Sequence, residues 1–457
     1  MPAVNYKDGD TIVARATPAG RGGIAVIRIS GPSVGTIAQA MIGSLPEPRF
    51  ATLRDFNDEA GEPIDSGIAL YFPAPHSFTG EDVLELHGHG GSIVSGLLIE
   101  RIEELGARTA EPGEFTRRAF INDKLDLNQA EAIADLIDSG SKTAARAAQR
   151  SLQGRFSAVV LALNKKITEL RMHVEAAIDF PEEEIDFLSD SALLARLDDV
   201  QSEFDRMEKT IRTGRLLRDG VHIVLAGQPN AGKSSLLNAL AGYDAAIVTD
   251  IPGTTRDIVR EHIEIDGLPV HIIDTAGLRE GRDVIEQEGI RRARQQIAAA
   301  DHALIVIDVT DRLSNQSENQ ETDWSGELPA GLGFTLVRNK IDLSGESPGI
   351  DAERPDTINV SALNGDGIDA LRNHIKTAIG YETDSGETIT ARQRHLDSLR
   401  LAREHFLAGK VQLLECAAGE LMAEELLQAQ NYLAEITGEF SSDDLLGKIF
   451  STFCIGK

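Results

Sequence analysis

The feature that most constrains this chain is the string Gly227-Gln228-Pro229-Asn230-Ala231-Gly232-Lys233-Ser234, which has the pattern of a phosphate-binding loop. It lies between residues 221–226, a mostly apolar run that predicts a buried strand, and residues 235–240, which predict a helix. Glycines in such a loop let backbone N–H groups turn toward a phosphate at the helix N-terminus, where the helix dipole also favours an anion. Lys233 would add positive charge near the β- and γ-phosphates, and the Ser234 hydroxyl would bind Mg²⁺. The string therefore predicts a nucleotide site; the alternative is a glycine-rich turn without a ligand.

Two further nucleotide motifs follow in order, each directly after a strand-like run. Asp274-Thr275-Ala276-Gly277 follows residues 270–273; its carboxylate can hold a magnesium-bound water, and its glycine N–H can contact a γ-phosphate. Asn339-Lys340-Ile341-Asp342 follows residues 334–337, and Asp342 can accept the paired N–H donors of guanine, which adenine lacks. Ser361-Ala362-Leu363, after residues 357–360, can support the base through backbone N–H groups. The three motifs together favour GTP over ATP.

Composition favours a protein of the cytoplasm. At 457 residues the chain should hold about three domains. Its two cysteines, Cys416 and Cys454, cannot form a disulfide framework, and no signal peptide opens the chain. Apolar runs such as residues 303–307 are too short to span a bilayer, so we expect no membrane association.

The charge balance is strongly acidic. Lys and Arg total 45 against 73 Asp and Glu, so the net charge is 45 − 73 = −28. This charge opposes general affinity for a polyanion, so a nucleic-acid substrate would have to be met locally or through a partner. The simpler alternative is that the acidic excess keeps the surface soluble.

Pattern and composition divide the chain into four segments. Residues 1–118 mix strand-like runs (11–14, 24–29 and 83–87) with one helix near 93–105. Residues 119–218 and 380–457 are helical, and we expect these two segments to pack together. Residues 219–379 alternate strands and helices as a doubly wound α/β sheet does. The predicted fold is therefore a P-loop GTPase domain inserted into an α-helical domain, preceded by an α+β domain.

Several strings outside the GTPase motifs resemble one family. They are residues 17–23 (TPAGRGG), 78–86 (FTGEDVLEL), 111–115 (EPGEF), 122–127 (NDKLDL) and the terminal Cys454-Ile455-Gly456-Lys457. The combination resembles the MnmE (TrmE) family of bacterial tRNA modification GTPases over essentially the whole chain. The resemblance implies that residues 1–118 bind folate and form a homodimer, and that residues 219–379 are a Ras-like G domain.

The resemblance also implies an activity. Members are potassium-stimulated GTPases that act with MnmG, an FAD-containing partner, in a heterotetrameric complex on tRNA. They add a (carboxymethyl)aminomethyl-type group to carbon 5 of the wobble uridine. The one-carbon donor is a reduced folate, 5-formyltetrahydrofolate or 5,10-methylenetetrahydrofolate. The alternative is a ribosome-assembly or other translation-linked regulatory GTPase without modification chemistry of its own.

GTP hydrolysis requires a group that orients water, and the usual glutamine position after Asp-x-x-Gly is Leu278, which cannot do so. Glu280, Glu286 and Glu288 are candidates by sequence, and the resemblance selects Glu286. Arg256 is an alternative source of charge stabilisation, as an arginine finger.

The resemblance assigns the remaining ligands. Mg²⁺ would be held by Ser234 and Thr255, and K⁺ by Asn230, Thr249, Ile251 and Thr254. The residues expected to contact GTP are Asn230, Ala231, Gly232, Lys233, Ser234, Ser235, Thr249, Asp250, Ile251, Pro252, Gly253, Thr254, Thr255, Asp274, Thr275, Ala276, Gly277, Asn339, Lys340, Ile341, Asp342, Ser361, Ala362 and Leu363.

The folate contacts implied by the resemblance are Arg28, Glu85, Lys124 and Lys457. These residue types fit, because a folate needs cations for its glutamate and a carboxylate for its amino-pyrimidine ring. Glu85, His87 and His89 would share one strand face, so a metal site is an alternative there. The resemblance makes Cys454 a residue of the modification step with a reactive thiol; the alternative is a buried anchor of the C-terminus.

Overall fold

The computed structural model describes residues 9–179, 191–242, 260–274, 300–310, 329, 331–381, 388–439 and 443–456. Contacts divide the chain into two compact units. One unit comprises Met1–Ala134, Leu152–Leu193 and Leu401–Lys457, and the other comprises Asp135–Ser151 and Leu194–Arg400. No helix in these described ranges is long and apolar enough to cross a membrane.

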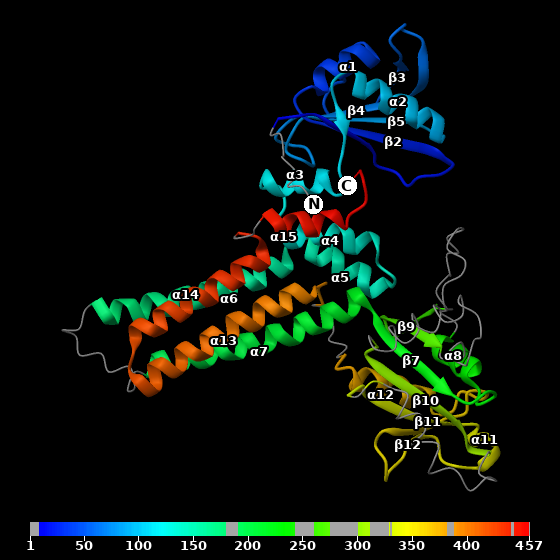
Figure 1. The fold of residues 1–457 in the computed structure, drawn as a ribbon, viewed down its shortest axis with the longest axis vertical. Helices are drawn as coiled ribbons and strands as arrows, with labels where there is room; N and C mark the ends of the chain where they lie inside the picture. Colours follow the sequence, from blue (N-terminus) through cyan, green and yellow to red (C-terminus); the bar gives the residue numbers. More distant parts are fainter. Residues whose placement is uncertain are drawn as a thin grey trace. The chain divides into compact units, whose positions relative to one another are not determined.

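The first unit begins with a six-stranded sheet (Figure 1). Its strands follow the order β3-β4-β5-β2-β1-β6, and all pairs are antiparallel except β1 with β6. The bounds are β1 Ile12–Arg15, β2 Gly22–Ser30, β3 Thr52–Asn57, β4 Pro63–Phe72, β5 Val83–Gly90 and β6 Arg108–Thr109. Helices α1 (Val34–Ile42) and α2 (Ser92–Glu104) contribute buried side chains to the same core as the strands. The runs 11–14, 24–29 and 83–87 are therefore confirmed as strands and 93–105 as a helix.

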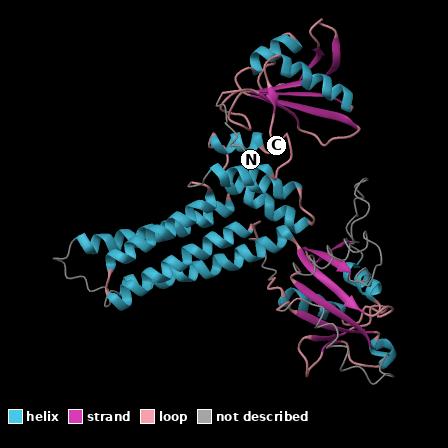
Figure 2. Ribbon diagram, viewed as in Figure 1, coloured by secondary structure: helices cyan, strands magenta, loops and turns pink. Residues whose placement is uncertain are grey.

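Long helices form the rest of this unit (Figure 2). Helix α6 (Arg155–Asp179) packs along α14 (Gly419–Thr437). Both bury residues at alternating spacings of three and four, which places one apolar stripe of each helix against its neighbour. These are Val160, Leu163, Ile167, Leu170 and Val174 in α6, and Met422, Leu426, Ala429, Leu433 and Ile436 in α14. The predicted packing of the two helical segments is confirmed for this pair.

The C-terminal segment packs on helices that follow the first sheet. Helix α15 (Asp443–Ser451) shares a buried cluster with α4 (Leu127–Ile137) and lies against α3 (Glu114–Ile121). The chain then pairs with the segment before α3, because Ile455 forms a β-bridge with Pro112. Gly113 has φ 68°, and a Cβ there would lie 2.7 Å from the Phe450 carbonyl oxygen, so only glycine allows this close approach.

The second unit is built on a seven-stranded sheet with the order β12-β13-β11-β10-β7-β9-β8. The central strands are parallel, and only the outer pairs β12·β13 and β8·β9 are antiparallel. The bounds are β7 Val221–Gly227, β8 Arg260–Ile265, β9 Leu268–Asp274, β10 His302–Asp308, β11 Phe334–Asn339, β12 Gly349–Ile350 and β13 Thr357–Asn359. The predicted strands 221–226, 270–273 and 334–337 all lie in this sheet, and the apolar run 303–307 and residues 357–359 are strands of it as well.

Helices α8 (Lys233–Ala241), α12 (Ile368–Ala378) and α5 (Lys142–Leu152) contribute buried side chains to the core of this sheet. The short helix α11 (Ile341–Ser344) follows β11. The long helix α7 (Ser191–Asp219) ends just before β7, and α13 (Gln393–Cys416) begins the return of the chain. Ala147 of α5 and Leu216 and Leu217 of α7 belong to the same buried cluster as the strands, so helical segments outside the GTPase motifs complete this core.

Candidate functional site

The phosphate-binding loop joins β7 to α8, as the sequence predicts. Asn230 and Gly232 have positive φ (66° and 91°), and Gly232 is the N-cap of α8. Lys233 folds back over the loop, and its Nζ donates to the carbonyl oxygens of Gly227 (2.8 Å) and Gln228 (3.0 Å). Ala231 is buried, whereas Ser234 and Ser235 are exposed in the first turn of α8. The loop thus presents an ammonium group and hydroxyls at a helix N-terminus, which is the chemistry that an anion requires.

Asn339 connects this loop to the motif expected to read the base. Its side chain is 2% exposed; Nδ2 donates to the Ala231 carbonyl (2.9 Å), and Oδ1 accepts from the Ala362 N–H (3.0 Å). A Cβ on Gly232 would lie 2.3 Å from Asn339 Nδ2. One buried amide therefore fixes three of the predicted GTP-binding segments relative to one another.

Asp342 is exposed at the start of α11, and its carboxylate is oriented by one neighbour. Ser361 Oγ donates to Asp342 Oδ1 at 2.6 Å. The other oxygen lone pairs remain available for the paired donors of a guanine edge. Ile341 is buried beneath this carboxylate, while Leu363 is 83% exposed. The structure therefore brings Asn339, Asp342 and the 361–363 loop together at the ends of neighbouring parallel strands.

Sequence reasoning missed Asp308, which holds Lys340. Asp308 ends β10 opposite Asn339 of β11, and its Oδ2 accepts from Lys340 Nζ at 2.5 Å. Burial by itself would raise the pKa of Asp308, but the hydrogen bond and charge of Lys340 and the two hydrogen bonds from Thr310 together outweigh burial and lower it. An aspartate directly after the apolar run 303–307 was the signal that could have identified it, because polar residues at carboxyl ends of parallel strands face the ligand crevice.

The remaining predicted GTP and metal ligands are only partly described. Asp274 ends β9 in register with Leu225 of β7, so it stands beside the strand that leads into the phosphate loop. The predicted residues Thr249, Asp250, Ile251, Pro252, Gly253, Thr254, Thr255, Thr275, Ala276, Gly277 and Glu286 lie outside the described residues, as does Lys457.

A second group of predicted residues lies on the first sheet. Arg28 of β2 stands opposite Glu85 of β5, and its Nε and Nη2 donate to Glu85 Oε1 at 2.9 and 2.8 Å. The Arg28 guanidinium lies 5.6 Å from the Phe78 ring centroid and 5.8 Å from that of Phe115. Burial by itself would raise the pKa of Glu85, but hydrogen bonds from His87 and Arg28 outweigh burial and lower it. Glu85 is therefore a charged acceptor at neutral pH.

Lys124 reaches the same region from the segment after α3. It is exposed, and its stem lies beside Gly80, where a Cβ would meet Lys124 Cγ and Cδ at 3.4 Å. Gly80 is two residues from Phe78, whose ring faces Arg28. The structure thus brings Arg28, Glu85 and Lys124 around one loop, residues 78–80; that they bind folate stays a prediction.

The metal alternative for Glu85, His87 and His89 is wrong. The three residues do share the more open face of β5. However, Glu85 Oε2 pairs with His87 Nε2 (3.1 Å), whereas His89 Nδ1 pairs with a different carboxylate, Asp65 Oδ1 (2.6 Å). Among the described residues, no group of three His, Cys, Asp or Glu side chains is arranged to hold a metal ion.

Cys454 is exposed, so the alternative of a buried cysteine anchor is wrong. The anchor is formed by its neighbours: Phe453 is 5% exposed, and the Cys454 carbonyl accepts from the Gly113 N–H at 3.3 Å. A Cβ on Gly456 would lie 2.3 Å from the Arg15 carbonyl oxygen. The backbone is therefore fixed beside the start of α3, which carries Phe115, while the thiol faces solvent.

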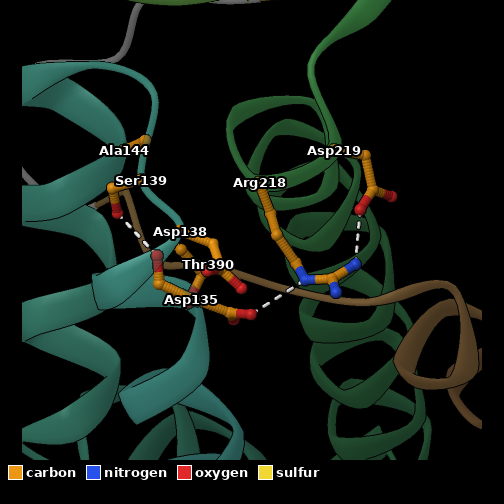
Figure 3. A pocket seen from close by; sticks show the side chains of 7 residues that line it. All are labelled: Asp135, Asp138, Ser139, Ala144, Arg218, Asp219 and Thr390. Carbon is orange, nitrogen blue, oxygen red and sulfur yellow. Dashed lines mark hydrogen bonds and ion pairs between the residues drawn. The ribbon is translucent and has the colours of Figure 1, made fainter. Parts of the chain in front are cut away.

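A small pocket lies apart from all these predicted residues (Figure 3). Its volume is about 90 Å³. It is lined by Asp135, Asp138, Ser139, Ala144, Arg218, Asp219 and Thr390. Asp135 Oδ1 accepts from Arg218 Nε (2.9 Å) and from Arg392 Nη2 (2.8 Å), so its charge is already paired and the pocket has a structural explanation.

Fold and motifs together define a P-loop GTPase domain carried by a helical protein with an additional α+β domain. Comparison with known families agrees: the description "MnmE helical domain" matches residues 127–454, and "GTP-binding protein TrmE N-terminus" matches residues 11–124. The chain belongs to the MnmE (TrmE) family, and it is a GTP hydrolase involved in tRNA modification.

Solved structures with some similarity are GTP-binding proteins. Era from Aquifex aeolicus, solved with GDP and AlF4⁻, is 27% identical over 41% of this chain and 66% of its own, with a TM-score of 0.26. The G domain of the FeoB iron transporter from T. maritima is 25% identical over 35% of this chain and 98% of its own, with a TM-score of 0.26. A GTP-binding protein from Sulfolobus solfataricus in complex with GDP is 16% identical over 62% of this chain and 76% of its own, with a TM-score of 0.26.

Proposed function

We propose that this chain is a potassium-stimulated GTPase that modifies carbon 5 of the wobble uridine in tRNA, together with the FAD-containing partner MnmG. A reduced folate, 5-formyl- or 5,10-methylenetetrahydrofolate, supplies one carbon, and the chain acts as a homodimer in the cytoplasm. The proposed domains are residues 1–118, 119–218 with 380–457, and 219–379. The observation that carries the proposal is the convergence of Arg28, Glu85 and Lys124 on one loop, far along the sequence from the GTP motifs.

The described residues fit the ligands that the proposal requires. Glu85 is a charged acceptor suited to the amino-pyrimidine end of a folate, and exposed Lys124 suits its glutamate carboxylates. Ser234, exposed at the start of α8, offers a hydroxyl oxygen for Mg²⁺, and Asn230, exposed in the loop, offers an amide oxygen for K⁺. When bound, the two cations would neutralise charge that develops on the phosphates.

The predicted residues then have defined tasks in GTP hydrolysis and in the modification step. Lys233 exchanges its two carbonyl acceptors for phosphate oxygens, because an ammonium gains more from a charged acceptor than from a neutral one. Asp342, oriented by Ser361, accepts the two donors of guanine. Glu286 orients the attacking water, and Cys454 serves the modification step with its exposed thiol.

Titration calorimetry with 5-formyltetrahydrofolate tests the proposal. We expect binding to the wild-type chain and at least tenfold weaker binding to Arg28→Ala, because loss of a charged hydrogen bond costs about 1.5–3 kcal/mol. Arg54→Ala, whose guanidinium contacts only the Leu53 carbonyl among the described contacts, is the matched control. No heat with the wild-type chain would favour the ribosome-assembly alternative.

Nucleotide specificity and cation dependence test the GTPase assignments. Asp342→Asn replaces a carboxylate oxygen with an amide donor, so GTP should bind at least tenfold more weakly, whereas XTP, which offers an acceptor there, should bind better. GTP turnover should be faster in K⁺ than in Na⁺ at equal ionic strength, and Asn230→Ala should abolish that difference. Equal rates in the two salts with the wild-type chain would contradict the potassium site.

A further inference from the structure

The loop Ser77–Asp82, between β4 and β5, is fixed by hydrogen bonds along its whole length. Asn122 Nδ2 donates to the Thr79 carbonyl (2.7 Å), and the Gly31 N–H donates to the Asp82 carbonyl (3.0 Å). Ser77 Oγ donates to the Glu81 carbonyl. Gly80 has φ 81° and lies against Asn122, so the turn has little room to change.

A buried network of hydrogen-bonded side chains also fixes the conformation of this loop. Ser30 Oγ lies 2.7 Å from Glu81 Oε2 and 2.7 Å from Thr79 Oγ1. A carboxylate only accepts, so Ser30 donates to Glu81 and Thr79 donates to Ser30. Thr79 Oγ1 in turn accepts from the Glu81 N–H at 3.3 Å. Thr79 is fully buried, so breaking this network would leave polar atoms without water.

Arg118 anchors the network to the rest of the domain. Its Nη1 donates to both Glu81 oxygens at 3.1 Å, and its Nη2 donates to Glu114 Oε1 (3.0 Å) and Asp10 Oδ1 (2.5 Å). Burial by itself would lower the pKa of Arg118, but the charges and hydrogen bonds of Glu81 and Glu114 outweigh burial and raise it. Glu81 is therefore held by a permanent charge that is 4% exposed.

Phe78 differs from the other side chains of this fixed loop, because its large apolar ring is 37% exposed. Its ring lies 5.6 Å from the Arg28 guanidinium, which pairs with Glu85. Lys124 lies against Gly80 on the same loop. An exposed flat ring on a fixed loop, beside the Arg28–Glu85 pair and two residues from the glycine that Lys124 contacts, is suited to stack on a planar heteroaromatic ligand at little cost in ordering.

We propose that Phe78 is a recognition residue that stacks on the planar ring of the ligand bound by Arg28 and Glu85, and that Glu81 is its positioning residue through Ser30 and Arg118. This proposal rests on the proposed folate function and names the contact that selects a flat heterocycle. The loop is preorganised, so binding energy is not spent on ordering it.

Titration of Phe78 variants with 5-formyltetrahydrofolate and, separately, with p-aminobenzoylglutamate tests the stacking. We expect Phe78→Ala and Phe78→Leu to bind the folate about fivefold to tenfold more weakly, and Phe78→Tyr to bind like wild type. The fragment, which lacks the pterin ring, should bind all four proteins equally. Phe50→Ala removes another exposed phenylalanine, 62% exposed, in the same domain and is the matched control.

Glu81→Gln tests the positioning, with Glu104→Gln, an exposed surface ion-pair residue, as control. We expect about fivefold weaker folate binding, and no further loss when Glu81→Gln is added to Phe78→Ala, because both changes act through one ring. Additive losses, or full affinity in Phe78→Leu, would overturn the inference. If the wild-type chain gives no heat, the folate function itself fails; if Arg28→Ala weakens binding and Phe78→Ala does not, only the stacking fails.

Discussion

At the residue scale, Asn339 connects two segments of the described part of the nucleotide site. Its amide satisfies a carbonyl of the phosphate loop and an N–H of the 361–363 loop, both at close to ideal distances. Because the side chain is 2% exposed, water cannot replace either bond. By fixing these two loops relative to each other, the Asn339 side chain affects nucleotide affinity in addition to any contact that it makes with the ligand.

Asn339→Ala should lower both stability and GTP affinity. Leaving two buried groups unpaired should cost about 2–4 kcal/mol of unfolding free energy. Urea unfolding and GDP titration would measure the two effects. Asn238→Ala, an exposed asparagine on α8, should change neither, and an equal loss in that control would show that Asn339 has no special role.

Comparing Gly232→Ala with Gly331→Ala separates the cost of backbone strain from the cost of a steric clash. Gly232 (φ 91°) and Gly331 (φ 92°) share a left-handed backbone, but a Cβ on Gly331 meets nothing within 4 Å, whereas on Gly232 it meets Asn339 at 2.3 Å. Both alanine variants should lose about 1–2 kcal/mol of stability to strain. Only Gly232→Ala should also lose GDP affinity, because its Cβ displaces the Asn339 side chain. Equal GDP affinity in the two variants would contradict the contact argument.

At the element scale, a histidine pair joins β10, β11 and α12. His302 Nε2 and His374 Nε2 lie 2.8 and 3.0 Å from the same Thr335 hydroxyl. His302 is 5% exposed. Burial lowers the pKa of His302, the charge of His374 lowers it further, and Asp356 opposes the shift. Burial of this junction therefore favours the neutral form of His302.

The sign of the pH effect follows from that shift. As the pH falls, the unfolded state, in which the histidine pKa is near 6.5, binds a proton at a higher pH than the folded state does. The contribution of His302 to the free energy of unfolding should therefore be complete above about pH 6.5 and decrease below it by up to about 1.4 kcal/mol per pH unit. Hydrogen exchange of peptides covering β10 and β11 should therefore speed up between pH 7.5 and 5.5, after correction for intrinsic rates. His302→Gln should flatten this dependence, and His76→Gln, an exposed histidine elsewhere, should not. A pH-independent β10 would refute the linkage.

Elements with strong periodic signals were predictable, and those with weak signals were not. The runs 221–226 and 303–307 are almost continuously apolar because both faces of a parallel strand are buried, which makes them visible in sequence. Strand β3 was missed, because only Phe56 is buried in it, and the polar and charged residues around an exposed Leu53 give no apolar alternation. The two hydrogen bonds of the Asn339 side chain and the pairing of Asp308 with Lys340 were not predictable for another reason: they join residues distant in sequence, which spacing alone cannot specify. Only the place of Asp308 at the end of an apolar run could have been recognised.

At the scale of the whole molecule, the net charge of −28 makes general attraction to tRNA unfavourable. The chain is nevertheless involved in tRNA modification through its family. Cations in the described ranges are often paired: Arg28, Arg118 and Arg338 all bind carboxylates. A binding surface for RNA must therefore be local or shared with a partner.

Within the second unit, the chain enters the GTPase sheet after α7 and leaves it toward α13, and a single carboxylate joins both connections. Asp135 accepts from Arg218, at the end of α7 (Figure 3), and from Arg392, directly before α13. The Asp135 side chain is 6% exposed, against 31% and 14% for the two arginines. The carboxylate is thus the buried member of the cluster, and its loss would remove the one acceptor that both guanidinium groups share.

Asp135→Ala should loosen both connections together. Removing one partner of a buried ion pair is strongly destabilising, but the arginines retain some water, so we expect a loss of about 1–3 kcal/mol. Asp135→Asn keeps the shape and one acceptor and should lose less. Asp369→Asn is the control, because Asp369 also pairs with an arginine but its side chain is 93% exposed. Hydrogen exchange of residues 216–220 and 388–392 should accelerate in parallel in Asp135→Ala, because one group holds both segments; acceleration of only one segment would show that the two connections are held independently.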